Sequence, residues 1–70
     1  MTLDAPLRFA LQQLAHGAPL DAEAAADAFG VVMWGQATPV QTAALLMGLR
    51  ARGETADEVA GAAIALRRAM

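Results

Sequence analysis

Seven consecutive residues without a polar side chain, AALLMGL at 43–49, lie between a helix start signal and a helix stop signal. The start is Thr38, Pro39 and Gln41, which supply an N-cap, a proline at the first helical position and a capping-box partner. The stop is Gly53. Because an ordinary surface helix has one polar face, we expect this helix to be central in a bundle and also to face a partner outside it.

Three further helices are predicted from the same kinds of signal. Asp4 and Asp21 are N-cap candidates for the first two, and Gly17 ends the first. Thr55 and Glu58 form a second capping box before the last helix. The sequence therefore predicts an all-α fold, a small bundle of four short helices that forms a single domain over residues 1–70. The predicted helices cover about 4–16, 21–34, 39–52 and 56–69.

The predicted fourth helix has an apolar face but no stop signal. Val59, Ala63, Leu66 and Met70 mark this face at helical spacing. No glycine, asparagine or proline follows the last periodic residue. We therefore expect the chain to be an N-terminal fragment of a larger protein, and a dimer that exchanges this helix between copies is an open alternative.

Several classes of function are disfavoured by residue types that the chain lacks. It has no Ser, Cys, Lys, Tyr or Asn and a net charge of −2, so it has neither a thiolate metal site nor a basic stripe for nucleic acid. No apolar run approaches the roughly 20 residues that span a bilayer, and the N-terminus does not resemble a signal peptide. We expect a cytoplasmic protein with no nucleic-acid or membrane partner.

The side chains that most often carry chemistry have local structural explanations here. His16 falls in the last turn of the first helix, where a partial positive charge is favourable. Arg50 and Arg52 are interpreted as a C-terminal cap of the third helix, with phosphate binding as the alternative. Trp34 is the hardest residue to place, because it fits either the core or an exposed contact surface. An independent enzyme is therefore not expected.

The stretch from Gly35 to Met70 resembles the N-terminal helical domain of anthranilate phosphoribosyltransferase. Its ATPVQ and RGET turns favour this family over the pyrimidine nucleoside phosphorylases, which are similar in plan. Gly48 and Trp34 depart from the family pattern. The matching segments are GQATP at 35–39, QTAALLMGLR at 41–50, RGET at 52–55 and EVAGA at 58–62.

This resemblance implies a small helical domain joined by hinges to a larger α/β domain. The family enzyme transfers a phosphoribosyl group from phosphoribosyl pyrophosphate, with Mg²⁺, to anthranilate in tryptophan biosynthesis. Its pyrophosphate loop and metal ligands belong to the larger domain, so we assign no catalytic, cofactor-binding or metal residue to residues 1–70. Mg²⁺ is expected in the parent enzyme only, and the missing C-terminal α/β domain is the expected partner.

The resemblance also implies a homodimer whose interface uses the helical domain, with that domain forming one wall of the cleft over the substrates. Candidate interface residues lie on the first and third helices, and each is an equally good core candidate. Two alternatives stay open: the same domain from a nucleoside phosphorylase or from a paralogue with another acceptor, and a free-standing helical interaction module. The candidates are Leu7, Phe9, Leu11, Leu46 and Met47.

Overall fold

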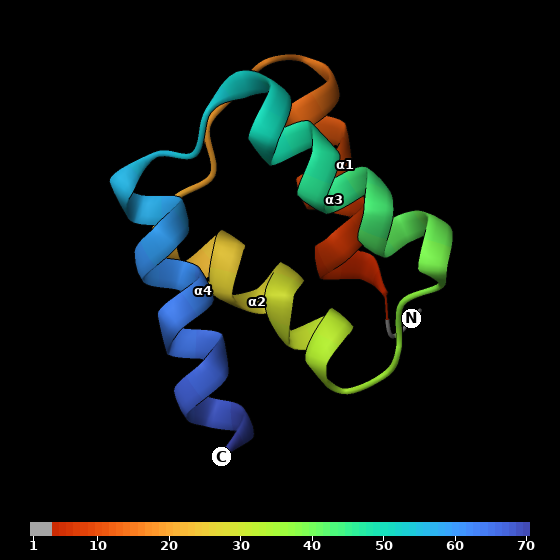
Figure 1. The fold of residues 1–70 in the computed structure, drawn as a ribbon, viewed down its shortest axis with the longest axis vertical. Helices are drawn as coiled ribbons and strands as arrows, with labels where there is room; N and C mark the ends of the chain where they lie inside the picture. The colour runs from red at the N-terminus through yellow and green to blue at the C-terminus, as the bar shows by residue number, and fades with distance from the viewer. Residues whose placement is uncertain (1–3) are drawn as a thin grey trace.

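The computed structural model describes residues 4–70, which form four α-helices and no strand. Figure 1 shows them as a small bundle in which α2 lies between α1 and α4. The predicted all-α fold is confirmed, and each predicted helix boundary is within about one residue of the observed one. The helices are α1 (Ala5–Ala15), α2 (Ala22–Met33), α3 (Pro39–Arg52) and α4 (Ala56–Ala69).

Local hydrogen bonds explain why the last two helices begin where they do. Thr38 and Gln41 form a complete capping box, in which the Thr38 hydroxyl accepts from the Gln41 backbone N–H at 3.1 Å. The Gln41 side chain accepts from the Thr38 backbone N–H at 2.9 Å. Thr55 and Glu58 repeat the arrangement at α4. Both predicted capping boxes are confirmed, and each satisfies two donors that a helix start otherwise leaves unpaired.

The first two helices begin differently from each other. Asp21 caps α2 through its side chain, which accepts from the Ala24 backbone N–H at 2.8 Å. Asp4 stands at the N-cap position of α1 but makes no side-chain capping bond. Instead its carboxylate accepts a hydrogen bond from Gln41 Nε2 at 2.9 Å. Gln41 therefore also ties the start of α1 to the start of α3.

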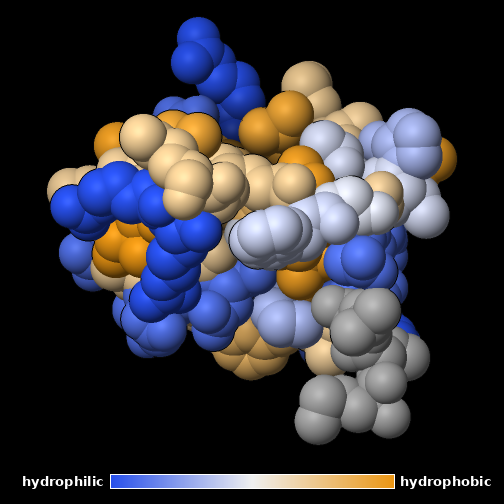
Figure 2. All heavy atoms as spheres, turned by 90° about the horizontal axis from the view of Figure 1, so that it is seen from below, coloured by the Kyte–Doolittle hydropathy of each residue, from blue (hydrophilic) through white to orange (hydrophobic). Residues whose placement is uncertain are grey.

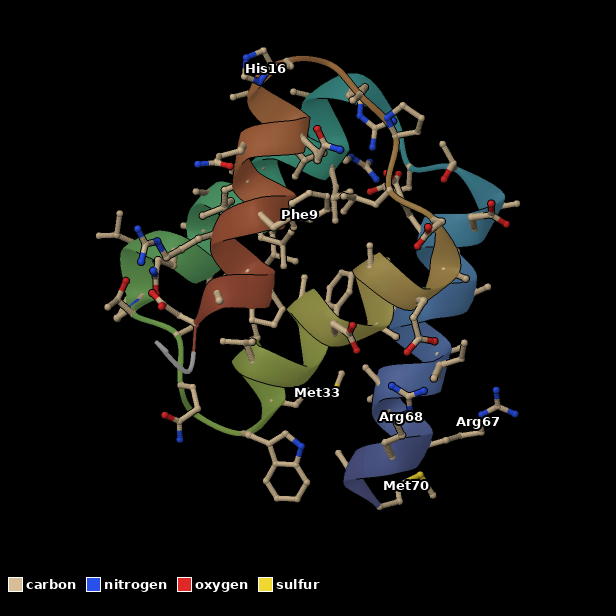
Figure 3. The ribbon with its side chains drawn as sticks, turned by 180° about the vertical axis from the view of Figure 1, so that it is seen from behind. Phe9, His16, Met33, Arg67, Arg68 and Met70 are labelled. Atoms are coloured by element: carbon tan, nitrogen blue, oxygen red, sulfur yellow. The ribbon has the colours of Figure 1, made fainter. Side chains whose placement is uncertain are left out.

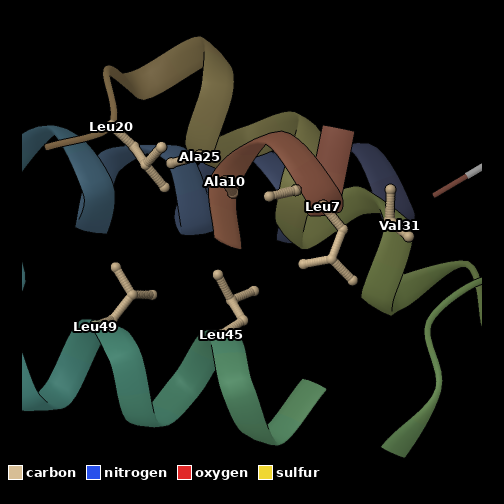
Figure 4. Packing of buried hydrophobic residues seen from close by; sticks show 8 residues of the cluster. Leu7, Ala10, Leu20, Ala25, Val31, Leu45 and Leu49 are labelled. Carbon is tan, nitrogen blue, oxygen red and sulfur yellow. The ribbon is translucent and has the colours of Figure 1, made fainter. Parts of the chain in front are cut away.

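The core lies between α1, α2 and α3 and is built largely from small side chains. Leu7 and Ala10 of α1 face Leu45 and Leu49 of α3 across it (Figure 4). Small alanine side chains allow α2 to approach α1 closely, which compensates for the little area that each one buries. The remaining members of the core cluster are Leu20, Ala25, Ala28 and Val31.

In the packing of the helices, α2 contacts both α1 and α4, whereas α3 packs mainly on α1. The contact between α2 and α4 is the most extensive, and it is made possible by Gly61. A Cβ at this position would lie 2.5 Å from Ala25 Cβ and 2.6 Å from the Ala22 carbonyl oxygen. Such separations are shorter than side chains tolerate, so the two helices approach this closely only because position 61 lacks a side chain.

This close contact leaves the apolar face that the sequence marked on α4 outside the core. The face marked by Val59, Ala63, Leu66 and Met70 is exposed, and Val59 and Leu66 are each more than half exposed. The buried residues of α4 are Glu58, Gly61 and Ala65. The small residues face the core because they permit close approach to α2, which the spacing of the large side chains could not indicate.

Candidate functional site

The most constrained polar cluster in the molecule surrounds Glu58. Its carboxylate is 1% exposed, yet it accepts the backbone N–H of Thr55 and the backbone N–H of Leu20, each at 2.9 Å. It also forms an ion pair with Arg52 at the end of α3. Because Leu20 precedes α2, this one carboxylate joins the α1–α2 connection, the end of α3 and the start of α4.

The environment of Glu58 acts on its pKa in opposing directions. Burial alone raises the pKa of the carboxyl group, because a low-dielectric site disfavours charge. The backbone N–H groups of Thr55 and Leu20 and the Arg52 guanidinium stabilise the ionised form, and together they hold the pKa of Glu58 below its usual value of 4.5. The cluster therefore holds a charged carboxylate, which suits a structural role better than proton transfer at neutral pH.

The Glu58 cluster corrects one sequence interpretation and extends another. Arg52 pairs with Glu58 and is not a C-terminal cap of α3; the helix ends at Gly53, whose N–H donates to the Leu49 carbonyl. The capping-box prediction found Glu58 but missed its contact with Leu20, 38 residues away. A capping box is a local pattern, so it carries no information about a third partner so distant in the chain.

His16 lies at the end of α1, as the sequence suggested (Figure 3). Its Nδ1 is 2.8 Å from the carbonyl oxygen of Gln12, one turn earlier in the helix. The two terminal arginines differ: Arg68 extends toward α2, where it approaches Glu23 at 3.7 Å and Asp27 at 3.8 Å. Arg67 extends away from the bundle (Figure 3). These exposed pairs contribute little to stability, on the order of 0–1 kcal/mol.

The five candidate interface residues do not form one surface. Leu7 is fully buried, so the structure assigns it to the core, the other role that the sequence left open. Leu11 is half-buried against that core. Phe9 is 50% exposed and lies on nearly the opposite side of α1 from Leu7, because successive helical residues are about 100° apart. Leu46 and Met47 are exposed at 52% and 66%.

The structure corrects the expectation that α3 is central in the bundle: α3 packs mainly on α1, and α2 is the helix that contacts both α1 and α4. Leu45 and Leu49 are the only buried residues of α3, so most of this apolar helix is open to the outside. Val40 is 78% exposed, and Met47 lies about two helical turns further along the same face. We call this surface the α3 outer face; it comprises Val40, Ala43, Ala44, Met47 and Ala51, all exposed.

Apolar grooves flank the α3 outer face on both sides. One, of about 270 Å³, separates α3 from α1 and is lined by Leu11, Leu14 and Gly48 among others. The other, of about 150 Å³, runs between α3 and α4 and is lined by Leu46, Val59 and Glu54 among others. Two of the large apolar side chains that the helices leave exposed, Leu46 and Val59, line the second groove, and exposed apolar surface of this kind is typical of contact sites.

Residues 4–70 provide no group of three or more His, Cys, Asp or Glu side chains that could hold a metal ion. No chemical step is assigned to the described residues. None of the helices formed by these residues has the length and apolar character needed to cross a membrane.

Comparison with known proteins identifies the bundle. Residues 8–70 match the family model described as the glycosyl transferase family, helical bundle domain. No solved structure matches the chain significantly.

Among curated relatives, the chain is 50% identical over 64 residues to the anthranilate phosphoribosyltransferase of Bradyrhizobium sp. (strain ORS 278), an alignment that covers 91% of this chain and 19% of the relative. It is 55% identical over 58 residues to that of Rhodopseudomonas palustris (strain BisA53), covering 83% of this chain and 17% of the relative. It is 46% identical over 66 residues to the anthranilate phosphoribosyltransferase of Chelativorans sp. (strain BNC1), an alignment that covers 94% of this chain and 20% of the relative.

The chain thus spans about a fifth of the length of the relatives that it matches. The match to the helical-bundle model extends through all four helices, from residue 8 in α1 to the last residue of the chain. The resemblance seen in the motifs between Gly35 and Met70 is confirmed. The chain belongs to the glycosyl transferase family and forms the helical bundle domain of that family.

Proposed function

We propose that this chain is the helical domain of an anthranilate phosphoribosyltransferase, which transfers the phosphoribosyl group of phosphoribosyl pyrophosphate to anthranilate. The observation that carries the proposal is the identity of about half of the aligned residues to proteins of that name over most of this chain. The bundle would act indirectly, by forming one wall of the substrate cleft, while the remaining four-fifths of the enzyme supplies the reacting groups.

The test uses the protein in which this sequence occurs in its source cells. We call this longer protein the long enzyme. With phosphoribosyl pyrophosphate and Mg²⁺, we expect it to consume anthranilate, and the loss of anthranilate fluorescence measures the reaction. The isolated 70-residue chain should give no turnover, because it lacks the remaining four-fifths of the enzyme that would supply the reacting groups. Phosphorolysis of pyrimidine nucleosides without anthranilate consumption would overturn the assignment in favour of a nucleoside phosphorylase.

The second part of the proposal is that the domain holds a homodimer through the α3 outer face. This face is apolar apart from Arg50 beside it, and no other helix of the described chain covers it. Such a surface resembles the apolar centre of a dimer interface more than an ordinary wet helix face. The flanking α1–α3 groove gives a protruding side chain of the second copy a place to pack.

Substitution of Met47 by glutamate tests this interface. The side chain is 66% exposed, so the change should leave the bundle folded. At a dimer contact it would bury an unpaired charge, which costs several kcal/mol and should shift the protein to monomer. Analytical ultracentrifugation of the long enzyme and the 70-residue chain measures this shift.

The matched control for Met47→Glu is Leu66→Glu, which places the same charge at a similarly exposed position on α4. We expect Leu66→Glu to leave the oligomeric state unchanged. Loss of the dimer with the control but not with Met47→Glu would place the interface on α4 and contradict this part of the proposal.

A further inference from the structure

The last helix, α4, is held most tightly near its start. It packs on α2, and no extensive contact joins it to α1 or α3 among the described residues. The contact with α2 is closest at Gly61, where an added Cβ would collide with Ala25. Beyond this crossing the two helices diverge (Figure 1), and a groove of about 300 Å³ lies between Ala65 and Arg68 of α4 and Trp34 at the end of α2.

The far end of α4 is open to the outside. Met70 is 99% exposed, and Trp34 is 66% exposed, so of the two places that the sequence left open for Trp34 the structure selects the surface. Figure 2 views this end of the molecule and shows apolar side chains open between hydrophilic ones. The pairs that Arg68 makes with Glu23 and Asp27 join exposed side chains, and such pairs hold a helix weakly. The far end therefore does little to fix the direction of α4.

Glu58 provides a separate attachment at the start of α4. Its carboxylate is 1% exposed, accepts the backbone N–H of Leu20 at 2.9 Å and pairs with Arg52. Gly61 follows three residues later, about 4.5 Å further along the helix axis. The helix is thus attached at two successive points, first to the α1–α2 connection and the end of α3, and then to α2. Two successive points fix a direction that either point alone would leave free to tilt.

A charged group at this buried position is suited to orienting a helix. Burial removes a carboxylate from water, and replacing a buried ion pair by apolar side chains is often neutral or stabilising. Stability alone therefore does not require a charge at position 58. Hydrogen bonds depend on angle as well as distance, whereas apolar contacts are not directional. The bonds of Glu58 to Leu20 and Arg52 accordingly define the orientation of α4 in a way that an apolar side chain would not.

The direction of α4 matters in the long enzyme, whose relatives are about five times the length of this chain and whose polypeptide would continue beyond α4. From Glu58 to Met70 the helix rises about 18 Å, so a tilt of about 10° would move its end by about 3 Å. A misplacement of about 1 Å, caused far from the chemistry, can cost about 10²-fold in rate. We infer that Glu58 is a positioning residue for the reaction, because it fixes the direction in which α4 leads into the rest of the enzyme; this inference rests on the proposed function.

The test compares Glu58→Ala with a core variant in the long enzyme. Leu45→Ala is the control, because Leu45 is fully buried in the core cluster and its loss also lowers stability. At a temperature well below both Tm values, we expect Glu58→Ala to lower kcat roughly tenfold or more while KM for anthranilate changes little, since alignment in the transition state is lost and substrate binding is not. Leu45→Ala should leave kcat nearly unchanged. Equal losses of kcat in the two variants would overturn the inference.

A second measurement follows α4 directly and does not need activity. The chain has no cysteine, so spin labels can be attached through Gln12→Cys on α1 and Arg67→Cys on α4, both exposed positions. Cysteines elsewhere in the long enzyme would be replaced first. Double electron–electron resonance then gives the distribution of distances between the labels. We expect Glu58→Ala to shift or broaden this distribution by several ångströms and Leu45→Ala to leave it unchanged. An unchanged distribution in Glu58→Ala would overturn the inference.

Glu58→Gln keeps the test decisive if Glu58→Ala fails to fold. It retains an oxygen that can accept the N–H of Leu20 but cannot form the ion pair with Arg52. We expect a smaller change of the label distances in the same direction. A folded Glu58→Gln enzyme with the label distances and kcat of the unsubstituted enzyme would contradict the inference.

Failure of this inference and failure of the proposed function give different results. A long enzyme that transfers the phosphoribosyl group and keeps its kcat in Glu58→Ala contradicts the inference alone. A long enzyme that consumes no anthranilate, but in which Glu58→Ala changes the label distances, contradicts the proposed function and leaves the orientation of α4 by Glu58 supported.

Discussion

Replacing Gly61 with valine should unfold the 70-residue chain or leave it close to unfolded. The first added carbon alone would lie 2.5 Å from Ala25 Cβ, 2.6 Å from the Ala22 carbonyl oxygen and 2.8 Å from the Ala26 backbone nitrogen. Two of these neighbours are backbone atoms of α2, so no side-chain rotation relieves the collision. The helices must separate, and overpacking of this kind costs roughly 1–3 kcal/mol or more.

That cost is large for a chain of this size. A domain of about 60 residues buries only about 60% of the surface that its unfolded chain exposes, less than a larger domain does, so its stability is correspondingly marginal. Gly61→Ala should have the same sign but a smaller effect, because the helix propensity of alanine returns about 1 kcal/mol. The measurement is the midpoint of urea unfolding followed by circular dichroism.

Gly30→Ala is the matched control for Gly61→Ala, since both glycines lie inside helices. It should raise the midpoint in the short chain, because position 30 has open space around it. If Gly61→Ala raised the midpoint as much as Gly30→Ala does, the close contact between α2 and α4 would be wrong.

Removal of the Glu58 carboxylate should have the second-largest effect. Glu58→Ala leaves the backbone N–H groups of Leu20 and Thr55 without their acceptor and leaves Arg52 without its counter-ion. Removing one partner of a buried pair costs about 3–5 kcal/mol. We expect the lower end of that range, because the Arg52 side chain is 20% exposed and can regain contact with water.

The dependence of the free energy of unfolding on pH, measured below neutrality, provides an independent check on the role of Glu58. The pKa of this carboxyl group is lowered in the folded chain, so its contribution to stability is complete above the ordinary carboxyl pKa and is lost as the pH falls through the lower, folded value. Glu58→Gln keeps an oxygen acceptor but cannot ionise. The stability difference between the unsubstituted chain and Glu58→Gln should therefore be greatest near neutral pH and should shrink below about pH 4.5.

Glu54→Ala is the control for both Glu58 experiments, because Glu54 belongs to the same connection but is exposed. Its effect should stay within about 0.5 kcal/mol, as for most surface substitutions. An equal loss of stability from Glu54→Ala and Glu58→Ala would show that net charge matters and that the buried carboxylate has no special role.

Local signals in the sequence predicted the helices because each boundary depends on a few neighbouring residues. Thr38 with Gln41 and Thr55 with Glu58 form their capping boxes within one turn, so the pattern alone was sufficient. Gly17 and Gly53 have positive φ just after α1 and α3, as expected for the glycine stops that the sequence predicted for these helices.

Non-local packing is what the sequence could not supply. The orientation of α4 depends on how closely Gly61 lets α2 approach, and periodicity favoured the face with larger side chains instead. The third contact of Glu58 lies across 38 residues, beyond any local motif. The candidate contact residues mixed Leu7, which is in the core, with Met47, which is exposed, because apolar character alone does not show whether a side chain faces the core or a partner.

We propose that this bundle is one domain of a longer phosphoribosyltransferase. The most direct measurement is the intact mass of the polypeptide that carries this sequence in its source cells, obtained by mass spectrometry after capture with an antibody to the bundle. The account predicts a mass about five times that of the 70-residue chain, in line with relatives of which this chain covers 19%. A mass of 7.2 kDa, that of the chain itself, would contradict the account and identify a free-standing interaction module.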